Sequence, residues 1–308
     1  MIRMGLCALI ALCLWGCDAA PKNPPAKAPG PDDGLSPVAL AKDVPLASRK
    51  IVCLAPSLTE TVFAIGAGDR VIGVSDFATY PPETQSLTRL GGLLNPNLER
   101  IVALAPDVIF LHAANDELAR RLQKLGMRVR TFAASSLEEI YKVILRLGQE
   151  VGMDADAGAI VTGMKRELRH TTVAPDTPRV KVLVVVGRAP GSLAGLRSVG
   201  PGAFLHELIV LGGGENVAAS TGQPWPEMSK EAIVAAAPDV IIELAPGATD
   251  NDEEALSVWK KLPSIPAVRR GQVHRFTEDH LLIPGPRLVS TARVLRGVLD
   301  AARPEPPR

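Results

Sequence analysis

Short apolar runs alternate with segments of helical periodicity along most of the chain after residue 48. In the first half, the runs that predict buried strands lie at residues 49–54, 71–74, 107–111 and 128–132. The segments that predict helices between them lie at residues 57–65, 97–105 and 116–125. Strands that are apolar on both faces and alternate with helices are typical of a parallel sheet covered on both sides.

Capping residues indicate where these helices begin and end. Ser57 and Glu60 have the spacing of a capping box, which predicts that a helix opens at Ser57 and closes at Gly66. Asn97 is a favourable N-cap for the next helix, and Gly126 can end the third.

The second half of the chain repeats this order of elements. Strands are predicted at residues 179–186 and 239–244, helices at 203–211 and 229–237, and a helix stop at the glycines 212–214. Residues 99–109 also match residues 231–241 in their letters, at a constant offset of 132. The repeat predicts two structurally related lobes.

A purely helical segment separates the two halves. Ser136 and Glu139 form a capping-box pattern that opens one helix, and a second helix is predicted from Asp154 to His170. The predicted fold is therefore α/β, with two related lobes, each a mainly parallel sheet covered by helices, joined by one long backbone helix. The expected boundaries are 49–150 for the N-terminal lobe, 151–174 for the linking helix and 175–305 for the C-terminal lobe. One long helix predicts little motion between the lobes.

The N-terminus has the layout of a secretory signal. A basic residue precedes an apolar run that is too short to span a bilayer, and Gly16 and Cys17 follow it. Residues 14–17 resemble the bacterial lipobox, which implies that residues 1–16 are removed and that Cys17 is acylated. The alternative is an ordinary signal or short anchor with an incidental cysteine. Several acyl chains on one residue would anchor the protein stably.

Residues 17–48 are rich in proline and alanine, which predicts a disordered tether. Asp18, directly after the acylated cysteine, resembles an inner-membrane retention signal. The expected location is therefore the periplasm, with the lipid anchor as the contact with the inner membrane. Cys53 is the one cysteine left in the folded part, where it is interpreted as a core residue, so no disulfide is expected.

Composition narrows the function. The 34 basic and 33 acidic residues nearly balance, so no nucleic-acid partner is expected. The sequence lacks the nucleophile, phosphate-binding and dinucleotide-binding motifs of common enzyme classes, and no enzymatic activity is expected. A lipid-anchored hydrolase is kept as an alternative from another functional class.

Several segments taken together resemble the substrate-binding proteins of ABC importers for vitamin B12, iron–siderophores and haem, most of all the cobalamin-binding branch. The matching residues are 51–60, 76–82, 97–104 with 106–107, 213–217, 224–231 and 285–287. The resemblance implies a ligand gripped between the lobes and delivery to a permease dimer. The expected ligand is a cobalamin-like corrinoid that carries its own metal, with no separate cofactor. An iron–siderophore or haem is the alternative.

Ligands of open α/β sheets bind at the carboxyl ends of the strands. Together with the resemblance, this rule selects the candidate ligand residues Ser57, Phe77, Tyr80, Leu93, His112, Arg188, Trp225 and His280. Trp225, an indole between two prolines, suits flat contact with a large ring. Core capping is the alternative for Trp225, and ordinary loop packing is the alternative for Phe77 and Tyr80.

The remaining candidates depart from the resembling pattern or have another explanation. Leu93, His112 and His280 stand where a well-known cobalamin binder has tryptophans. Arg188 either pairs with a ligand carboxylate or phosphate or is a solvated loop charge. No histidine has a metal-ligand spacing, and no metal site is expected. A zinc or manganese receptor is a further alternative, in which His112 and His280 meet across the cleft with Glu278 or Asp279.

The repeat also places two acids at equivalent positions of the two lobes. Glu99 and Glu231 each follow a capping residue, Asn97 or Ser229, by two positions. The resemblance implies that one glutamate on each lobe pairs with arginines of the permease dimer. A carboxylate is also favoured in the first turn of any helix by the helix dipole, so a role in capping alone is the alternative.

Overall fold

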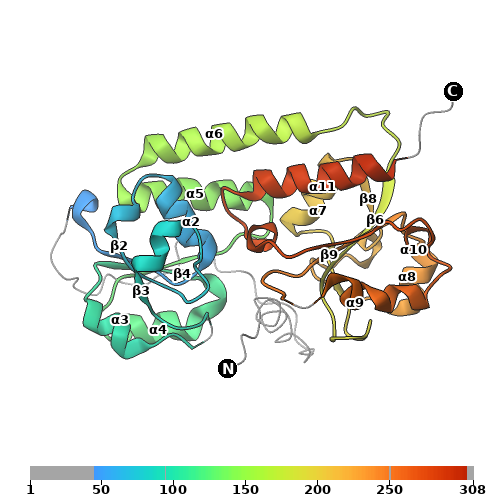
Figure 1. Ribbon diagram of the computed structural model, residues 1–308. Coiled ribbons are helices and arrows are strands. Elements are labelled where there is room, and N and C mark those ends of the chain that lie inside the picture. Colours follow the sequence, from blue (N-terminus) through green and yellow to red (C-terminus); the bar gives the residue numbers. More distant parts are fainter. Residues whose placement is uncertain (1–44, 94, 250, 304–308) are drawn as a thin grey trace, which may run out of the picture.

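The computed structural model describes residues 45–93, 95–249 and 251–303, which form two α/β lobes side by side beneath a pair of long helices (Figure 1). The predicted signal peptide, Cys17 and the tether as far as residue 44 lie outside these residues. The end of the predicted tether is structured, because Leu46–Ser48 form a 3-10 turn and Arg70 donates a 2.8 Å hydrogen bond to the Leu46 carbonyl. Among the described residues, no helix combines the length and apolar character needed to cross a membrane.

The N-terminal lobe contains a five-stranded parallel sheet in the order β3-β2-β1-β4-β5. Its strands are β1 (Ile51–Cys53), β2 (Val71–Val74), β3 (Thr88–Arg89), β4 (Val108–His112) and β5 (Val129–Phe132). Its helices are α2 (Pro56–Ala64), α3 (Leu98–Leu104) and α4 (Asp116–Lys124), with short 3-10 turns at Gly68–Arg70, Pro82–Ser86 and Ala113–Asn115. The apolar runs correctly predicted four strands. β3 was missed because it is two residues long and polar.

The C-terminal lobe contains a mainly parallel sheet in the order β10-β9-β6-β7, and β8 pairs with the first residues of β6. Its strands are β6 (Val180–Gly187), β7 (Arg197–Ser198), β8 (Gly214–Asn216), β9 (Val240–Leu244) and β10 (Val273–Phe276), of which β7 is antiparallel to β6. Its helices are α7 (Phe204–Leu211), α8 (Lys230–Ala236), α9 (Asp252–Leu256), α10 (Pro266–Arg269) and α11 (Leu288–Ala302), with 3-10 turns at Ala219–Thr221, Ser257–Lys261 and Asp279–Leu282. The predicted strands and helices of this half are confirmed, whereas the short strands β7, β8 and β10 were not predicted.

The repeat seen in the letters is also present in the backbone. Asn97 and Ser229 cap α3 and α8 by accepting hydrogen bonds from the backbone N–H groups three residues on. Both helices end at an alanine in the left-handed region, Ala105 at φ 46° and Ala237 at φ 48°. The strands that follow, β4 and β9, both pair in parallel with the first strand of their sheet, β1 and β6. The two lobes are therefore related copies of one unit, as predicted.

Two long helices form the predicted helical segment between the two halves of the chain, and the second of them lies within the predicted linking helix. α5 (Leu137–Val151) begins with the predicted capping box of Ser136 and Glu139, and α6 (Asp154–Thr171) runs along the top of the molecule from one lobe to the other (Figure 1). α5 packs on α2 and α6, and α6 packs on α11. One hydrophobic cluster runs from β1 through α5 and α6 to β6 and α11, so the lobes share a continuous core.

One predicted helix start is wrong. α2 begins at Pro56 with Ala55 as its N-cap, and no side chain caps it. Proline has no N–H group that needs a partner at the first helical position, and its fixed φ suits that position, so the helix begins at Pro56. Ser57 lies inside the first turn, where its carbonyl accepts a 2.7 Å bond from the Thr61 hydroxyl. Glu60 is consequently free of the capping box and is buried at the contact between the lobes.

Candidate functional site

The loop after β2 and the 3-10 turn before α11 meet across the two lobes. The hydroxyl of Thr79 donates a 2.6 Å hydrogen bond to Oδ2 of Asp279. Tyr80 and His280, which the sequence selected as ligand residues, are the next residues on these two segments. The fold therefore brings together two of the candidate regions, from residues that are 200 positions apart.

A buried ion pair lies beside this contact. Arg287, just before α11, donates to both carboxylate oxygens of Glu60 on α2, at 2.9 and 2.5 Å. The side chain of Glu60 is 3% exposed, and burial raises its pKa while the Arg287 guanidinium opposes that rise. Arg287 also contacts Asp279 at 3.3 Å and lies over the ring of Tyr80, 4.0 Å from the ring centre. Three side chains, those of Glu60, Asp279 and Tyr80, are thus arranged around one guanidinium.

The backbones also approach closely here. A Cβ built on Gly285 would lie 3.7 Å from the carbonyl oxygen of Ser57 and 3.9 Å from Oε2 of Glu60. Because the segment before α11 rests against the first turns of α2, Ser57 lies at the contact between the lobes. The sequence selected Ser57 as a ligand residue, and the structure places its carbonyl there.

The aromatic candidates differ in exposure. Tyr80 is 42% exposed, whereas Phe77 and Trp225 are half-buried, and Trp225 packs against the main core cluster. The loop around Trp225 is fixed because the flanking carbonyls of Pro224 and Pro226 accept backbone bonds of 2.8 and 2.9 Å from Gly200 and Ser198. A fixed, partly exposed indole is a suitable flat surface for a large ring.

The surroundings of Arg188 fit neither role that the sequence suggested, a ligand contact or a solvated loop charge. Its guanidinium pairs with both carboxylate oxygens of Glu243 at 2.6 and 3.1 Å, and its other donors reach the carbonyls of Ala189, Ser192 and Ala255. These five contacts match the five N–H groups of an arginine. Its side chain is only 10% exposed, so it is not a solvated loop charge, and it has no donor left for a ligand.

Sequence reasoning missed the partners of Arg188. Glu243 is buried in β9, and the indole Nε1 of the buried Trp259 donates to its Oε1 at 2.8 Å. A signal was present, since Glu243 interrupts the apolar run of residues 240–244. A carboxylate in a buried strand needs a partner.

The histidine candidates do not form a metal site in the described part of the chain. Nδ1 of His112 accepts a 3.2 Å hydrogen bond from the N–H of Ala114. Burial lowers the pKa of both His112 and His280, which favours neutral rings near pH 7. No group of three or more His, Cys, Asp or Glu residues among those described could hold a metal ion, so the geometry does not support the meeting of His112 and His280 with Glu278 or Asp279. Leu93 is half-buried in the loop after β3.

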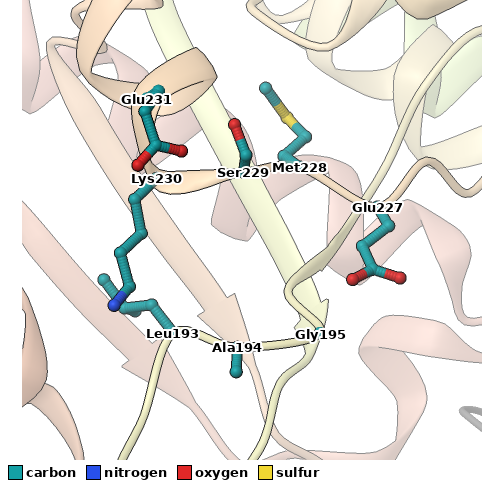
Figure 2. A pocket seen from close by; sticks show the side chains of 8 residues that line it. All are labelled: Leu193, Ala194, Gly195, Glu227, Met228, Ser229, Lys230 and Glu231. Atoms are coloured by element: carbon teal, nitrogen blue, oxygen red, sulfur yellow. The ribbon is translucent and has the colours of Figure 1, made fainter.

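The predicted docking residues are exposed on equivalent helices. Glu99 lies in the first turn of α3 and Glu231 in the first turn of α8. Hydrogen bonds from its own N–H and from the Ser229 hydroxyl lower the pKa of Glu231. Glu231 also lines an open pocket of about 580 Å³ on the C-terminal lobe (Figure 2). The other lining residues of the pocket are 193–195 and 227–230, so no candidate ligand residue lines it.

Comparison with known proteins gives a consistent result. Residues 51–279 match the model of the family described as periplasmic binding protein. The chain is 32% identical over 254 residues to the uncharacterized ABC transporter substrate-binding lipoprotein YvrC of Bacillus subtilis, with 78% of this chain and 76% of YvrC covered. It is 27% identical to the vitamin B12-binding protein of Pectobacterium carotovorum, with coverage of 83% and 90%. The structure matches the periplasmic vitamin B12-binding protein BtuF of Vibrio cholerae with a TM-score of 0.69 at 25% identity, over 83% of this chain and 98% of BtuF.

Proposed function

The chain belongs to the periplasmic binding protein family, and from this premise we propose that it captures a cobalamin-like corrinoid and delivers it to an ABC importer. The observation that carries the proposal is the meeting of two candidate ligand segments, in which Thr79 donates a hydrogen bond to Asp279 across the lobes next to the exposed ring of Tyr80. The rigid loop of Trp225 adds a flat apolar surface on the second lobe. The vitamin B12-binding proteins among the sequence relatives support the choice of a corrinoid.

Affinity in this proposal comes from preorganisation. A large rigid ring system that enters a cleft with fixed walls buries much apolar area, while few side chains have to be ordered. The shared core through α5 and α6 is expected to limit the relative motion of the lobes. Arg188 takes no part in binding, since Glu243 occupies its guanidinium.

The test is a titration of the protein lacking residues 1–20 with cyanocobalamin and cobinamide, and with haem and a ferric siderophore as competitors. Calorimetry is expected to show corrinoid binding at about micromolar Kd or tighter. Removal of the signal also removes Trp15, which leaves Trp225 and Trp259 as the two tryptophans. Quenching by the corrinoid is expected to be weaker in Trp225→Phe, because the buried Trp259 cannot contact the ligand. Binding of a siderophore or haem without corrinoid binding would replace the corrinoid with that ligand.

Delivery to the permease is assigned to Glu99 and Glu231. The Glu99→Lys/Glu231→Lys protein is expected to bind ligand within a few-fold of wild type and to lose transporter association and uptake, because charge on a docking surface governs encounter and orientation. The matched control is Glu117→Lys/Glu138→Lys, which reverses two exposed acids in the first turns of α4 and α5. If the docking variant supports uptake like wild type, the two glutamates only stabilise their helices.

The anchor is assigned to Cys17, which lies outside the described residues. Cys17→Ala is expected to release the protein from the membrane fraction or to leave it unprocessed. Fractionation of the wild type into the outer membrane would contradict the inner-membrane location that Asp18 suggests.

A further inference from the structure

The contacts around Arg287 link three segments that are far apart in the sequence. Glu60 belongs to α2 of the first lobe, Thr79 and Tyr80 to the loop after β2, and Asp279 to the 3-10 turn of the second lobe. These five residues are called the inter-lobe clasp below. Glu60 and Arg287 are 227 positions apart, so the clasp exists only because the lobes are docked in this arrangement.

Glu60 fixes Arg287 in place. The carboxylate is 3% exposed and sits on a helix, and it accepts both parallel hydrogen bonds from the guanidinium. Such a bidentate pair sets the orientation of the guanidinium plane as well as its position. A buried carboxylate without its counter-charge has a high free energy, so Arg287 is expected to stay paired with Glu60.

Arg287 in turn holds the loop that carries the aromatic candidates. Arg89 of the same lobe ties the base of this loop, with bonds of 3.1 and 2.7 Å to the carbonyls of Ser75 and Ala78. The tip of the loop is held from the other lobe, since the Tyr80 ring lies on the guanidinium and Thr79 bonds Asp279. Tyr80 is still 42% exposed, so the ring is held and also accessible.

We infer that Arg287 is a positioning residue of the ligand site: anchored by Glu60, it orients the Tyr80 ring and, through Asp279, the loop of residues 76–80 as a preformed wall of the cleft. The inference deepens the proposed function and rests on it for the statement that this wall contacts the ligand. The wall is formed before the ligand arrives, so the ligand does not have to order it. The residue that contacts the ligand, Tyr80, is then different from the residue that holds it in place, Arg287.

The first experiment measures the loop without any ligand. Backbone hydrogen exchange of residues 76–80 is compared in wild type, Arg287→Lys, Thr79→Val and Arg293→Lys. Lysine keeps the charge but loses the planar, bidentate and stacking contacts, so Arg287→Lys is expected to speed exchange in this loop by about tenfold. Thr79→Val removes one cross-lobe bond and is expected to give a smaller increase. Arg293→Lys is the control. Arg293 lies on α11 and pairs with Glu167 of α6, but its side chain is 59% exposed and it is not part of the clasp.

The second experiment measures cyanocobalamin affinity by calorimetry. Arg287→Lys and Tyr80→Leu are each expected to weaken binding by about tenfold, with no further loss in the double variant, because both changes remove the same held ring. Tyr80→Phe keeps the ring and is expected to bind like wild type. Circular dichroism melts verify folding, and Thr79→Val, which leaves the Glu60–Arg287 pair intact, tests the clasp if Arg287→Lys does not fold.

The outcomes separate the two proposals. Unchanged exchange in residues 76–80 in both Arg287→Lys and Thr79→Val overturns the clasp, whatever the ligand. Faster exchange with unchanged cyanocobalamin affinity overturns the positioning role. If the wild type binds no corrinoid, the proposed ligand fails, whereas the exchange result still decides whether Arg287 holds the loop.

Discussion

The two lobes share one backbone unit but differ in what they bury. β4 and β9 occupy the same place in their sheets, and residue 111 of β4 corresponds to residue 243 of β9 by the offset of the repeat. In the first lobe this residue is Leu111, fully buried in an apolar cluster. In the second it is Glu243, 4% exposed and bonded to Arg188 and Trp259. One architecture therefore tolerates either an apolar or an ionic interior at the same position.

The difference shows what a buried charge requires. Glu243 is accommodated because an arginine from the loop after β6 and an indole from the 3-10 turn of residues 257–261 both reach it. Leu111, the apolar residue at the equivalent position of β4, needs only neighbours that pack closely around it. A buried ion pair contributes little net stability compared with apolar packing, although breaking it is costly. The second lobe is thus more sensitive to single substitutions at this position.

The largest effect is expected from removing one member of the pair. Glu243→Leu should lower the free energy of unfolding by about 3–5 kcal/mol, because it leaves the buried Arg188 without a counter-charge. Arg188→Met/Glu243→Leu, which imitates the first lobe, should recover most of this loss. Urea denaturation followed by circular dichroism measures both. A double variant as unstable as the single one would show that the second lobe cannot adopt the apolar solution.

The helix caps should behave alike in the two lobes. Asn97→Ala and Ser229→Ala remove equivalent cap hydrogen bonds, and each is expected to cost about 1 kcal/mol of stability. Asn115→Ala is the control, because Asn115 precedes α4 without a side-chain cap bond. Denaturation midpoints of the three variants give the comparison. Clearly unequal losses for Asn97 and Ser229 would limit the equivalence of the lobes to the backbone.

The left-handed alanines offer a gain in both lobes. Ala105→Gly and Ala237→Gly should each stabilise the protein by about 0.5–1 kcal/mol, because glycine has no Cβ to strain at φ 46° and 48°. Ala103→Gly, inside α3, is expected to destabilise it by about 1 kcal/mol and serves as the opposite case. Thermal unfolding of the three proteins is sufficient to distinguish the signs.

The smallest effect concerns the pKa of Glu231. Its own N–H and the Ser229 hydroxyl stabilise the carboxylate, so Ser229→Ala should raise the pKa of Glu231 towards its ordinary value, as measured by NMR titration. A carboxyl whose pKa is lowered in the folded state stabilises the fold above the pKa of the unfolded chain. That contribution is lost as the pH falls through the folded pKa. If the titration of Glu231 is unchanged in Ser229→Ala, its own N–H group in the first turn of α8 accounts for the lowered pKa.

The sequence alone determined the main strands and helices, the repeat and most caps. The capping box of Ser136 and the cap of Asn97 depend on groups three residues apart, so the spacing of letters is sufficient to predict them. The apolar runs likewise determined the main strands, because a strand buried on both faces must be apolar. Family resemblance added the segments that carry the candidate ligand residues.

Only the tertiary structure decided which charges meet. Glu60 had the local spacing of a capping residue, yet it forms an ion pair with Arg287 from the far end of the chain. Arg188 forms its ion pair with Glu243, 55 positions away. Such pairs depend on strand order and on how the lobes dock, and neither leaves a periodic signal in the sequence. The free energy of a buried charge depends on its surroundings in three dimensions, so the roles of these residues became visible only in the folded chain.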